Sequence, residues 1–288
     1  MLKKLIKKHI ETTIPKNENV AVMFSGGLDS LSVLLSALEL GYELKLYTFY
    51  LKGVVSKDLE TARKVSKHYK LELHEVEISD NINLLIDDLK YLIKTHDLKK
   101  KTQFQVMHPM KHLCESIEEN YVLSGLEADT LYGNTRSMRK TINCESDFKN
   151  IRSKYIYDEN NASYSFIRNE LANNNKIFIA PYKQSSEIIN YFLNLKSKDL
   201  CFGKQKKQTY EAFKTEIDNL DLYRRSSNMQ INSGIREFHD LLLQTELNKN
   251  NYKSVVGVYN QLIKIVKEEF WCYVYLSRLQ VLVLKEWH

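Results

Sequence analysis

Glycine and proline are scarce in this sequence, with nine glycines and three prolines among 288 residues. This scarcity excludes a collagen-like chain and a disordered chain rich in these two residues. The four cysteines include no pair spaced as Cys-x-x-Cys, which excludes the short metal-binding and redox motifs of that form. We expect each cysteine to be a reduced thiol, as in a cytoplasmic protein.

Long apolar runs are also missing. The closest, 270–284, is interrupted by Arg278 and Gln280, whereas a membrane-spanning helix needs about 18 or more apolar residues in succession. The N-terminus carries four lysines within its first eight residues and no apolar core of the secretory type. We therefore expect a cytoplasmic protein without a membrane partner.

The charge of the chain is mildly basic, at a net +6 from 42 basic and 36 acidic residues. This balance permits an anionic partner, such as a nucleotide or a nucleic acid, but does not require one. Because 43% of the residues are hydrophobic, a chain of this length can bury a substantial core.

Apolar patterns typical of strands alternate along the chain with patterns typical of helices. We expect strands at 20–24, 44–49, 71–78 and 121–123, and helices at 2–10, 31–38, 56–68, 82–93 and, starting after Pro109, within 107–117. This alternation predicts an α/β fold with a mostly parallel sheet flanked by helices. The polar segment 136–175 is expected to be a long, partly helical excursion. We expect one main domain over 1–200 and a helical C-terminal region over 201–288.

The strongest local signal lies between the first expected strand and its helix, in the hexapeptide Ser25-Gly26-Gly27-Leu28-Asp29-Ser30. Two adjacent glycines let the backbone approach an anion closely. The helix start then presents N–H groups and the positive end of the helix dipole, and the two serines add hydroxyl donors. The loop therefore suits a phosphate or pyrophosphate. Asp29 would repel such a group unless a cation such as Mg²⁺ lies between them.

This loop differs from the P-loop of kinases and GTPases, because no Gly-Lys-Ser/Thr follows at the required spacing. It resembles the pyrophosphate loop of the N-type ATP pyrophosphatases, the PP-loop superfamily, whose members split ATP between its α and β phosphates. The resemblance implies an adenine nucleotide alpha-hydrolase-like fold, ATP as a substrate and an adenylated intermediate.

A second segment, Ser124-Gly125-Leu126-Glu127-Ala128-Asp129-Thr130-Leu131-Tyr132-Gly133, follows the fourth expected strand. It is similar to the Ser-Gly-Glu-Gly-Ala-Asp-Glu-Leu-Phe-Gly segment in the synthetase domain of asparagine synthetases. The resemblance implies that Asp29 and Asp129 together hold Mg²⁺ on the pyrophosphate and that Ser124 and Gly125 contact the nucleotide. It also implies that adenine lies near Phe49, at the end of the second strand. The resemblance covers roughly residues 1–215.

Several positions depart from the family pattern. Leu126 stands where the family has Glu, Glu127 where it has Gly, and Lys183-Gln184 where it has Leu-Asp. We expect the acid that handles the family's amino-acid substrate or acyl intermediate to be absent or shifted to Glu127. Position 2 is Leu rather than a catalytic Cys, and only about 24 residues precede the first loop. We therefore expect the amine to come from free ammonia, a substrate amine or a partner protein.

A cluster of lysines ahead of an expected helix resembles the family's basic patch near the α-phosphate. Lys204 and Lys206 are the candidates for offsetting charge on the reacting phosphorus. Arg136 and Arg139, after the second loop, could also reach phosphates. His108 and His112 lie four apart and could share a helix face as metal ligands, but no third ligand is evident at a suitable spacing. A structural role is preferred for these two histidines.

Three functions remain open on these observations. The first is an AMP-forming ligase that joins a small-molecule carboxylate or amide to an amine. The second is adenylation of a nucleobase in tRNA or DNA, with a phosphate backbone bound by Lys99–Lys101, Lys204–Lys207 and Arg224-Arg225. The third is a non-catalytic nucleotide-binding module.

Overall fold

The computed structural model describes residues 1–158, 161–223 and 229–269 and has a five-stranded sheet at its centre. The strand order is β3-β2-β1-β4-β5, and every neighbouring pair is parallel. The strands are β1 (Asn19–Met23), β2 (Glu43–Leu51), β3 (Glu72–Ile78), β4 (Tyr121–Ser124) and β5 (Ile177–Ile179). The expected α/β fold with a parallel sheet is confirmed.

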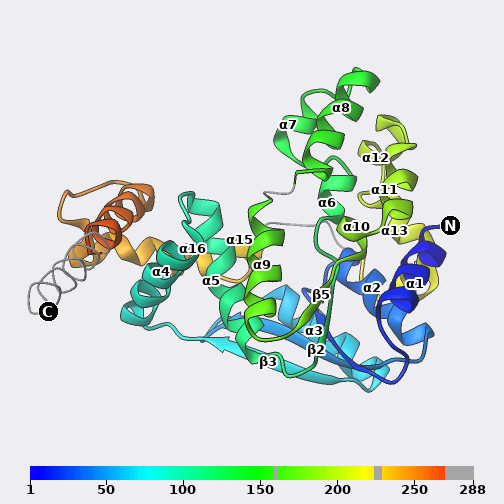
Figure 1. The fold of residues 1–288 in the computed structure, drawn as a ribbon, viewed down its shortest axis with the longest axis horizontal. Helices are drawn as coiled ribbons and strands as arrows, with labels where there is room; N and C mark the ends of the chain where they lie inside the picture. The colour runs from blue at the N-terminus through cyan, green and yellow to red at the C-terminus, as the bar shows by residue number, and fades with distance from the viewer. Residues whose placement is uncertain (159–160, 224–228, 270–288) are drawn as a thin grey trace, which may run out of the picture.

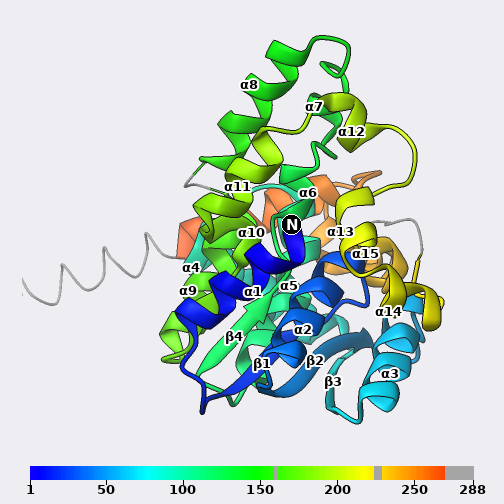
Figure 2. The same cartoon turned by 90° about the vertical axis from the view of Figure 1, so that its right-hand side faces the viewer.

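Helices cover both faces of this sheet, as Figures 1 and 2 show from two sides. They are α1 (Leu2–Thr13), α2 (Leu28–Glu39), α3 (Lys57–Tyr69), α4 (Ile82–His96), α5 (Lys101–Ser116), α6 (Ala128–Leu131), α7 (Arg136–Arg139), α8 (Glu145–Ile156), α9 (Ala162–Asn173), α10 (Pro181–Gln184), α11 (Ser186–Leu193), α12 (Ser197–Cys201), α13 (Lys207–Ala212), α14 (Lys214–Asn219), α15 (Met229–Asn232), α16 (Ile235–Asp240), η1 (Leu241–Gln244) and η2 (Glu246–Asn248). Residues 255–269 are also helical.

The two faces of the sheet carry separate hydrophobic cores. In β1, Val20 and Val22 pack into the core with α1, α2 and α3, whereas Ala21 and Met23 pack into the core with α4, α5 and α9. Side chains alternate between the faces of a strand, so a strand buried on both sides is apolar throughout. This explains why β1 reads as a continuous apolar run.

Local signals define both ends of α3, and its start is as expected. Ser56 is the N-cap residue just before α3, and its hydroxyl accepts a hydrogen bond from the backbone N–H of Leu59 at 3.1 Å. Such a cap satisfies one of the unpaired N–H groups at a helix start. At the other end of α3, Lys70 is in the left-handed conformation. Helices commonly end on a residue in this conformation.

Three sequence-based expectations need correction or addition. Helix α5 begins at Lys101 and continues through Pro109, so the expected start after this proline is wrong. The preceding turns are held by burial of Phe104 and Met107 against the sheet, which offsets the hydrogen bond that proline cannot make. Strand β5 was not expected, because it has only three residues in a polar stretch. The 136–175 excursion contains α7, α8 and α9, and α9 packs against α5 and β5.

The C-terminal region is helical in its described part, as expected. It packs on both sides of the molecule, since α13 contacts α1 and α2 while α16 contacts α5. A domain boundary near residue 200 stays a prediction. The apolar stretch 270–284 lies outside the described residues. Within the described ranges, every helix is too short or too polar to cross a lipid bilayer.

Candidate active site

A cavity of about 400 Å³ opens at the carboxyl ends of β1, β2 and β4. In open parallel sheets, ligands bind at this edge. The predicted residues that line it are Ser25, Gly27, Leu28, Asp29, Ser30, Phe49, Ser124, Gly125, Glu127, Asp129 and Lys206. Gly26 and Lys204 are not among the lining residues. The structure thus brings together nearly all of the residues chosen from the sequence.

The first loop turns sharply between β1 and α2. Gly26 has φ +69°, and a Cβ there would meet the Thr61 Cβ at 2.8 Å, so both its conformation and its space require glycine. The Ser30 hydroxyl donates to the Gly27 carbonyl at 3.0 Å and lies 3.2 Å from the Ser25 hydroxyl. Gly27 precedes α2 without a side-chain cap, so the start of the helix presents its backbone N–H groups at the cavity.

The second loop touches the first through its backbone. A Cβ on Gly125 would lie 2.4 Å from the carbonyl carbon of Asp29 and 2.5 Å from the Ser30 nitrogen. These neighbours are main-chain atoms, which cannot rotate away. Glycine at 125 therefore lets the two loops meet, and this contact sets the spacing between the two predicted metal ligands.

Replacing Gly125 with Ala should push the loops apart. We expect at least about a tenfold loss of ATP-analogue affinity and a destabilisation of about 1–3 kcal/mol, because overpacking forces backbone shifts. Calorimetric titration and thermal unfolding measure the two effects. Gly41→Ala is the matched control: a Cβ there meets nothing within 4 Å, so only the strain of φ +80° is added. Unchanged affinity in Gly125→Ala would contradict the proposed loop contact.

Asp29 and Asp129, a hundred positions apart, converge on one ammonium group. The Lys206 Nζ pairs with the Asp29 Oδ2 and lies 3.1 Å from the Asp129 Oδ1. Lys206 is buried, Asp29 is half-buried and Asp129 is exposed. Within the described residues, the buried Asp29 Oδ1 has no hydrogen-bond partner.

Burial governs the charges in this cluster. It raises the pKa of Asp29 to about 6; Asp129 adds to the rise and Lys206 opposes it. Burial alone would lower the pKa of Lys206, but the Asp29 and Asp129 carboxylates outweigh it and raise that pKa above its usual value. A buried carboxylate oxygen without a partner, beside a second carboxylate, fits a Mg²⁺ ion, which prefers oxygen ligands.

Asp129 is positioned by a chain of polar contacts. The Asn134 amide donates to the Asp129 Oδ1 at 2.9 Å, and the Arg139 guanidinium donates to the Asn134 Oδ1 at 2.6 Å and to the Cys201 carbonyl at 3.2 Å. Arg139 thus donates its hydrogen bonds to Asn134 and Cys201, and it supports Asp129 through Asn134. Its predicted role as a phosphate ligand has no support in these contacts.

Lys206 is positioned by a buried hydroxyl network that the sequence analysis did not find. The Tyr182 hydroxyl lies 2.7 Å from the Ser32 hydroxyl in α2, and the Tyr132 hydroxyl lies 2.8 Å from the Thr209 hydroxyl. The Thr209 N–H also donates to the Tyr132 hydroxyl at 2.9 Å. Because Lys206 is the residue before α13 and Thr209 lies in its first turn, this network holds the lysine beside α2. The signal in the sequence is the tyrosine of Ala180-Pro181-Tyr182.

The other two predicted catalytic residues, Lys204 and Glu127, differ in whether they line the cavity. The Lys204 Nζ lies over the rings of Tyr210 and Tyr223, 3.1 and 4.2 Å from their centroids. Glu127 lines the cavity, and its Oε2 accepts a hydrogen bond from the Thr130 hydroxyl at 2.8 Å. Burial raises the pKa of Glu127, an effect that the Thr130 bond and Lys183 partly counter.

The solved structures that are similar to this chain include two with low overall structural similarity. One is a predicted tRNA methyltransferase subunit from Methanocaldococcus jannaschii, with TM-score 0.34 and 16% identity, covering 73% of this chain and 94% of that one. The other is the U34-tRNA thiolase of Methanococcus maripaludis, solved with its 4Fe–4S cluster, with TM-score 0.39 and 14% identity, covering 92% and 78%. At these scores neither carries an argument about function.

Sequence comparisons are more specific. A probable glutamine-hydrolysing asparagine synthetase from Acanthamoeba polyphaga mimivirus is 23% identical over 231 residues, which are 76% of this chain and 41% of the relative. The chain thus spans less than half the length of that protein. The family model for asparagine synthase matches residues 1–288. This match confirms the resemblance to the PP-loop superfamily. The chain belongs to the asparagine synthase family.

Proposed function

We propose that this protein is an AMP-forming carbon–nitrogen ligase. It adenylates a carboxylate or amide oxygen of a small molecule with ATP and then transfers the activated group to an amine. The observation that carries the proposal is the convergence of Asp29, Asp129 and Lys206 on the wall of the cavity between the two loops. It puts two carboxylates and a lysine beside a loop suited to pyrophosphate.

Each group has a defined task in this reaction. The Ser25–Ser30 loop and the α2 N-terminus bind the leaving pyrophosphate through backbone N–H groups. Mg²⁺ held by Asp29 and Asp129 would neutralise charge on the phosphate oxygens. The Lys206 ammonium, which pairs with both carboxylates in this structure, would stabilise negative charge on the α-phosphate during the reaction. Phe49, half-buried at the end of β2, lies where adenine is expected.

The proposed reaction takes place in two steps, adenylation of the substrate and transfer of the activated group to the amine. In the first, a substrate oxygen bonds to the α-phosphorus while the bond from that phosphorus to the bridging oxygen breaks, releasing pyrophosphate. In the second, the amine nitrogen bonds to the activated carbon and AMP leaves with the bond electrons. The proton lost by the amine goes to a base, and Glu127, whose pKa burial raises above its usual value, is the candidate.

The part of the cavity expected to bind the adenylated substrate differs from that of an enzyme making asparagine. Leu126 lines the cavity at the position where the family segment has Glu. A leucine cannot bind the ammonium group of an amino acid or serve as a base. We therefore infer that the adenylated substrate differs from free aspartate.

The test is oxygen transfer from substrate to AMP. A panel of carboxylates and amides, labelled with ¹⁸O at the acyl oxygen, would be incubated with the protein, ATP, Mg²⁺ and ammonia or primary amines. We expect AMP and pyrophosphate in equal amounts, with one ¹⁸O atom in each AMP. Formation of ADP and phosphate, or AMP labelled only from water, would contradict the proposal. ATP binding without any cleavage would favour the non-catalytic alternative.

The nucleic-acid alternative has less support in the structure. Lys99 pairs with Asp97, Lys101 pairs with Asp240, and Lys204 lies over two tyrosine rings. Arg224 and Arg225 lie outside the described residues. Binding of tRNA that weakens steeply with salt would revive this alternative.

A further inference from the structure

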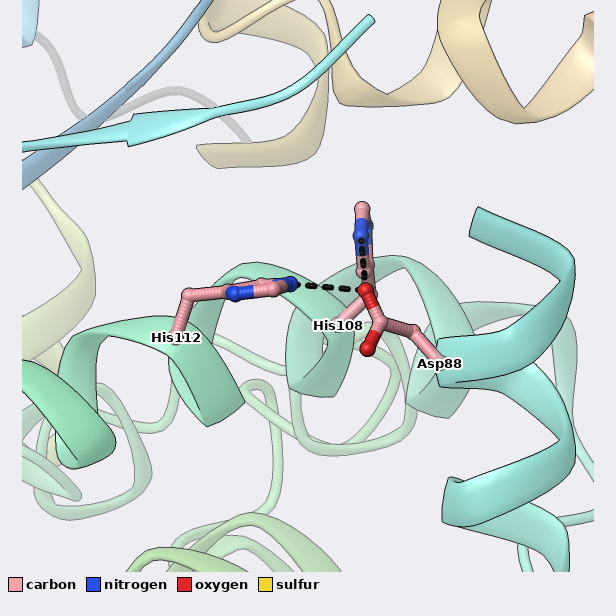
Figure 3. A group of neighbouring side chains, drawn as sticks. All are labelled: Asp88, His108 and His112. Carbon is pink, nitrogen blue, oxygen red and sulfur yellow. Dashed lines mark hydrogen bonds and ion pairs between the residues drawn. The ribbon is translucent and has the colours of Figure 1, made fainter. Parts of the chain in front are cut away.

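The histidine pair of α5 has a third neighbour that the sequence did not indicate. Asp88 of α4 points at His108 and His112, as Figure 3 shows. Its Oδ2 lies 2.7 Å from the His112 Nε2 and 3.4 Å from the His108 Nε2. The three potential ligand atoms all lie within 4.8 Å of one another.

We propose that Asp88, His108 and His112 bind a divalent transition-metal ion of the zinc type, at a site separate from the ATP cavity. Two imidazoles and one carboxylate, with a remaining position for water, form a common ligand set for such ions. Ligand atoms bound at about 2.0–2.1 Å in tetrahedral geometry are about 3.3 Å apart, close to the spacing between Asp88 and His108. Mg²⁺ suits the site poorly, because it prefers oxygen ligands.

The outer contacts needed by such a site are already in place. The Asp88 Oδ1, the oxygen turned away from the histidines, pairs with the Lys111 Nζ at 3.2 Å. Lys111 also pairs with Glu115 at 3.0 Å, so a second carboxylate balances its charge. Carboxylate ligands of metals are themselves usually hydrogen-bonded in this way, which orients them.

His108 has a matching partner on its other ring nitrogen. Its Nδ1 lies 3.2 Å from the His239 Nε2, and the His239 Nδ1 lies 2.7 Å from the Tyr259 hydroxyl. For the His108 Nε2 to bind a metal, its proton must sit on Nδ1 and be donated to His239. His239 then carries its own proton on Nδ1 and donates to Tyr259. The two observed hydrogen bonds, from His108 to His239 and from His239 to Tyr259, are compatible with this tautomer without moving any atom other than hydrogen. Such partners are expected for the outer contacts of a metal-bound histidine.

The proposed metal site is accessible to solvent, and it shares helix α5 with the ATP cavity. The side chain of His112 is 30% exposed, which gives an ion a path from solvent, whereas His108 is buried. Asp88 belongs to α4, His239 to α16, and Tyr259 to the helix at 255–269. A bound ion would therefore link α4 to α5, and the hydrogen bonds of His108 continue from α5 to α16 and to the helix at 255–269. The same α5 lines the ATP cavity through Val106, Met110 and Leu113.

Titration of the metal-stripped full chain with Zn²⁺ and with Co²⁺ tests the proposal. We expect one equivalent of Zn²⁺ to bind in the presence of excess Mg²⁺ and to raise the unfolding temperature. Co²⁺ should give the intense visible absorption of a four- or five-coordinate ion. His112→Gln changes the more exposed histidine and should weaken Zn²⁺ binding at least about tenfold. Asp88→Asn should do the same, with circular dichroism confirming that both variants fold.

Two controls separate this site from other metal binding. His68→Gln removes an exposed histidine of α3 and should leave the affinity unchanged. Asp129→Asn alters the predicted Mg²⁺ site and should leave the Co²⁺ spectrum unchanged. The proposal is overturned if Zn²⁺ does not bind at micromolar concentration, if His112→Gln binds as tightly as the parent, or if Asp129→Asn abolishes the spectrum. None of these outcomes depends on the ligase reaction.

Discussion

Replacing Asp29 with Asn should reduce the Mg²⁺-dependent affinity for an ATP analogue at least about tenfold and the adenylation rate about a hundredfold or more. Asp29 supplies the buried oxygen that lacks a partner within the described residues, and the amide cannot supply its negative charge to an ion. Titration calorimetry with α,β-methylene-ATP, with and without Mg²⁺, measures the first effect and needs no knowledge of the acceptor. Exchange of labelled pyrophosphate into ATP measures the second.

Glu39→Gln is the matched control for Asp29. Glu39 lies at the last turn of the same helix, α2, and its carboxylate also pairs with lysines, Lys3 and Lys7. It is far along the helix from the loop, so we expect binding and exchange within about twofold of the parent, as for most surface substitutions. Equal losses in the two variants would show that the effect is one of helix stability. Full Mg²⁺-dependent binding by Asp29→Asn would remove Asp29 from the metal site.

Replacing Lys206 with Met should lower the adenylation rate by about a hundredfold to a thousandfold, the usual effect of removing one preorganised group that stabilises a transition state. Met retains much of the side-chain volume, so the loss reports the charge. Nucleotide binding should fall less than the rate, because the lysine is paired with Asp29 and Asp129 before the metal binds. Pyrophosphate exchange rates set against analogue affinities separate the two effects.

Lys204→Met is the informative comparison, because the sequence did not distinguish Lys204 from Lys206. Lys204 lies over Tyr210 and Tyr223, and its loss should cost about 0.5–1 kcal/mol of cation–π stabilisation and at most about a threefold change in rate. If Lys204→Met lost as much activity as Lys206→Met, the lysine would have to leave the tyrosines during turnover. If Lys206→Met kept full activity, the proposed role of Lys206 would be wrong.

The sequence predicted most of what depends on near neighbours in the chain. Four of the five strands, the start of α3 and the two functional loops follow from periodicity, capping and short motifs. Helix α5 is one exception among the long elements, because Pro109 is a strong local signal that the burial of Phe104 and Met107 overrides. Strand β5 is too short for its period to be seen, and only its pairing with β4 defines it.

By itself the sequence determined that an apolar strand leads into each of two loops bearing Asp29 and Asp129. Only the tertiary structure decided that these loops touch, because β1 and β4 are neighbours in the sheet although about a hundred residues separate them. It also placed Lys206, and not Lys204, at the cavity wall, where the hydroxyl network of Tyr132 and Thr209 holds α13, and it brought Asp88 next to His108 and His112. The physical reason is the same in each case. Periodicity and capping act over a few residues and leave a trace in the sequence, whereas contacts between distant segments depend on strand order and helix packing, which no local pattern encodes.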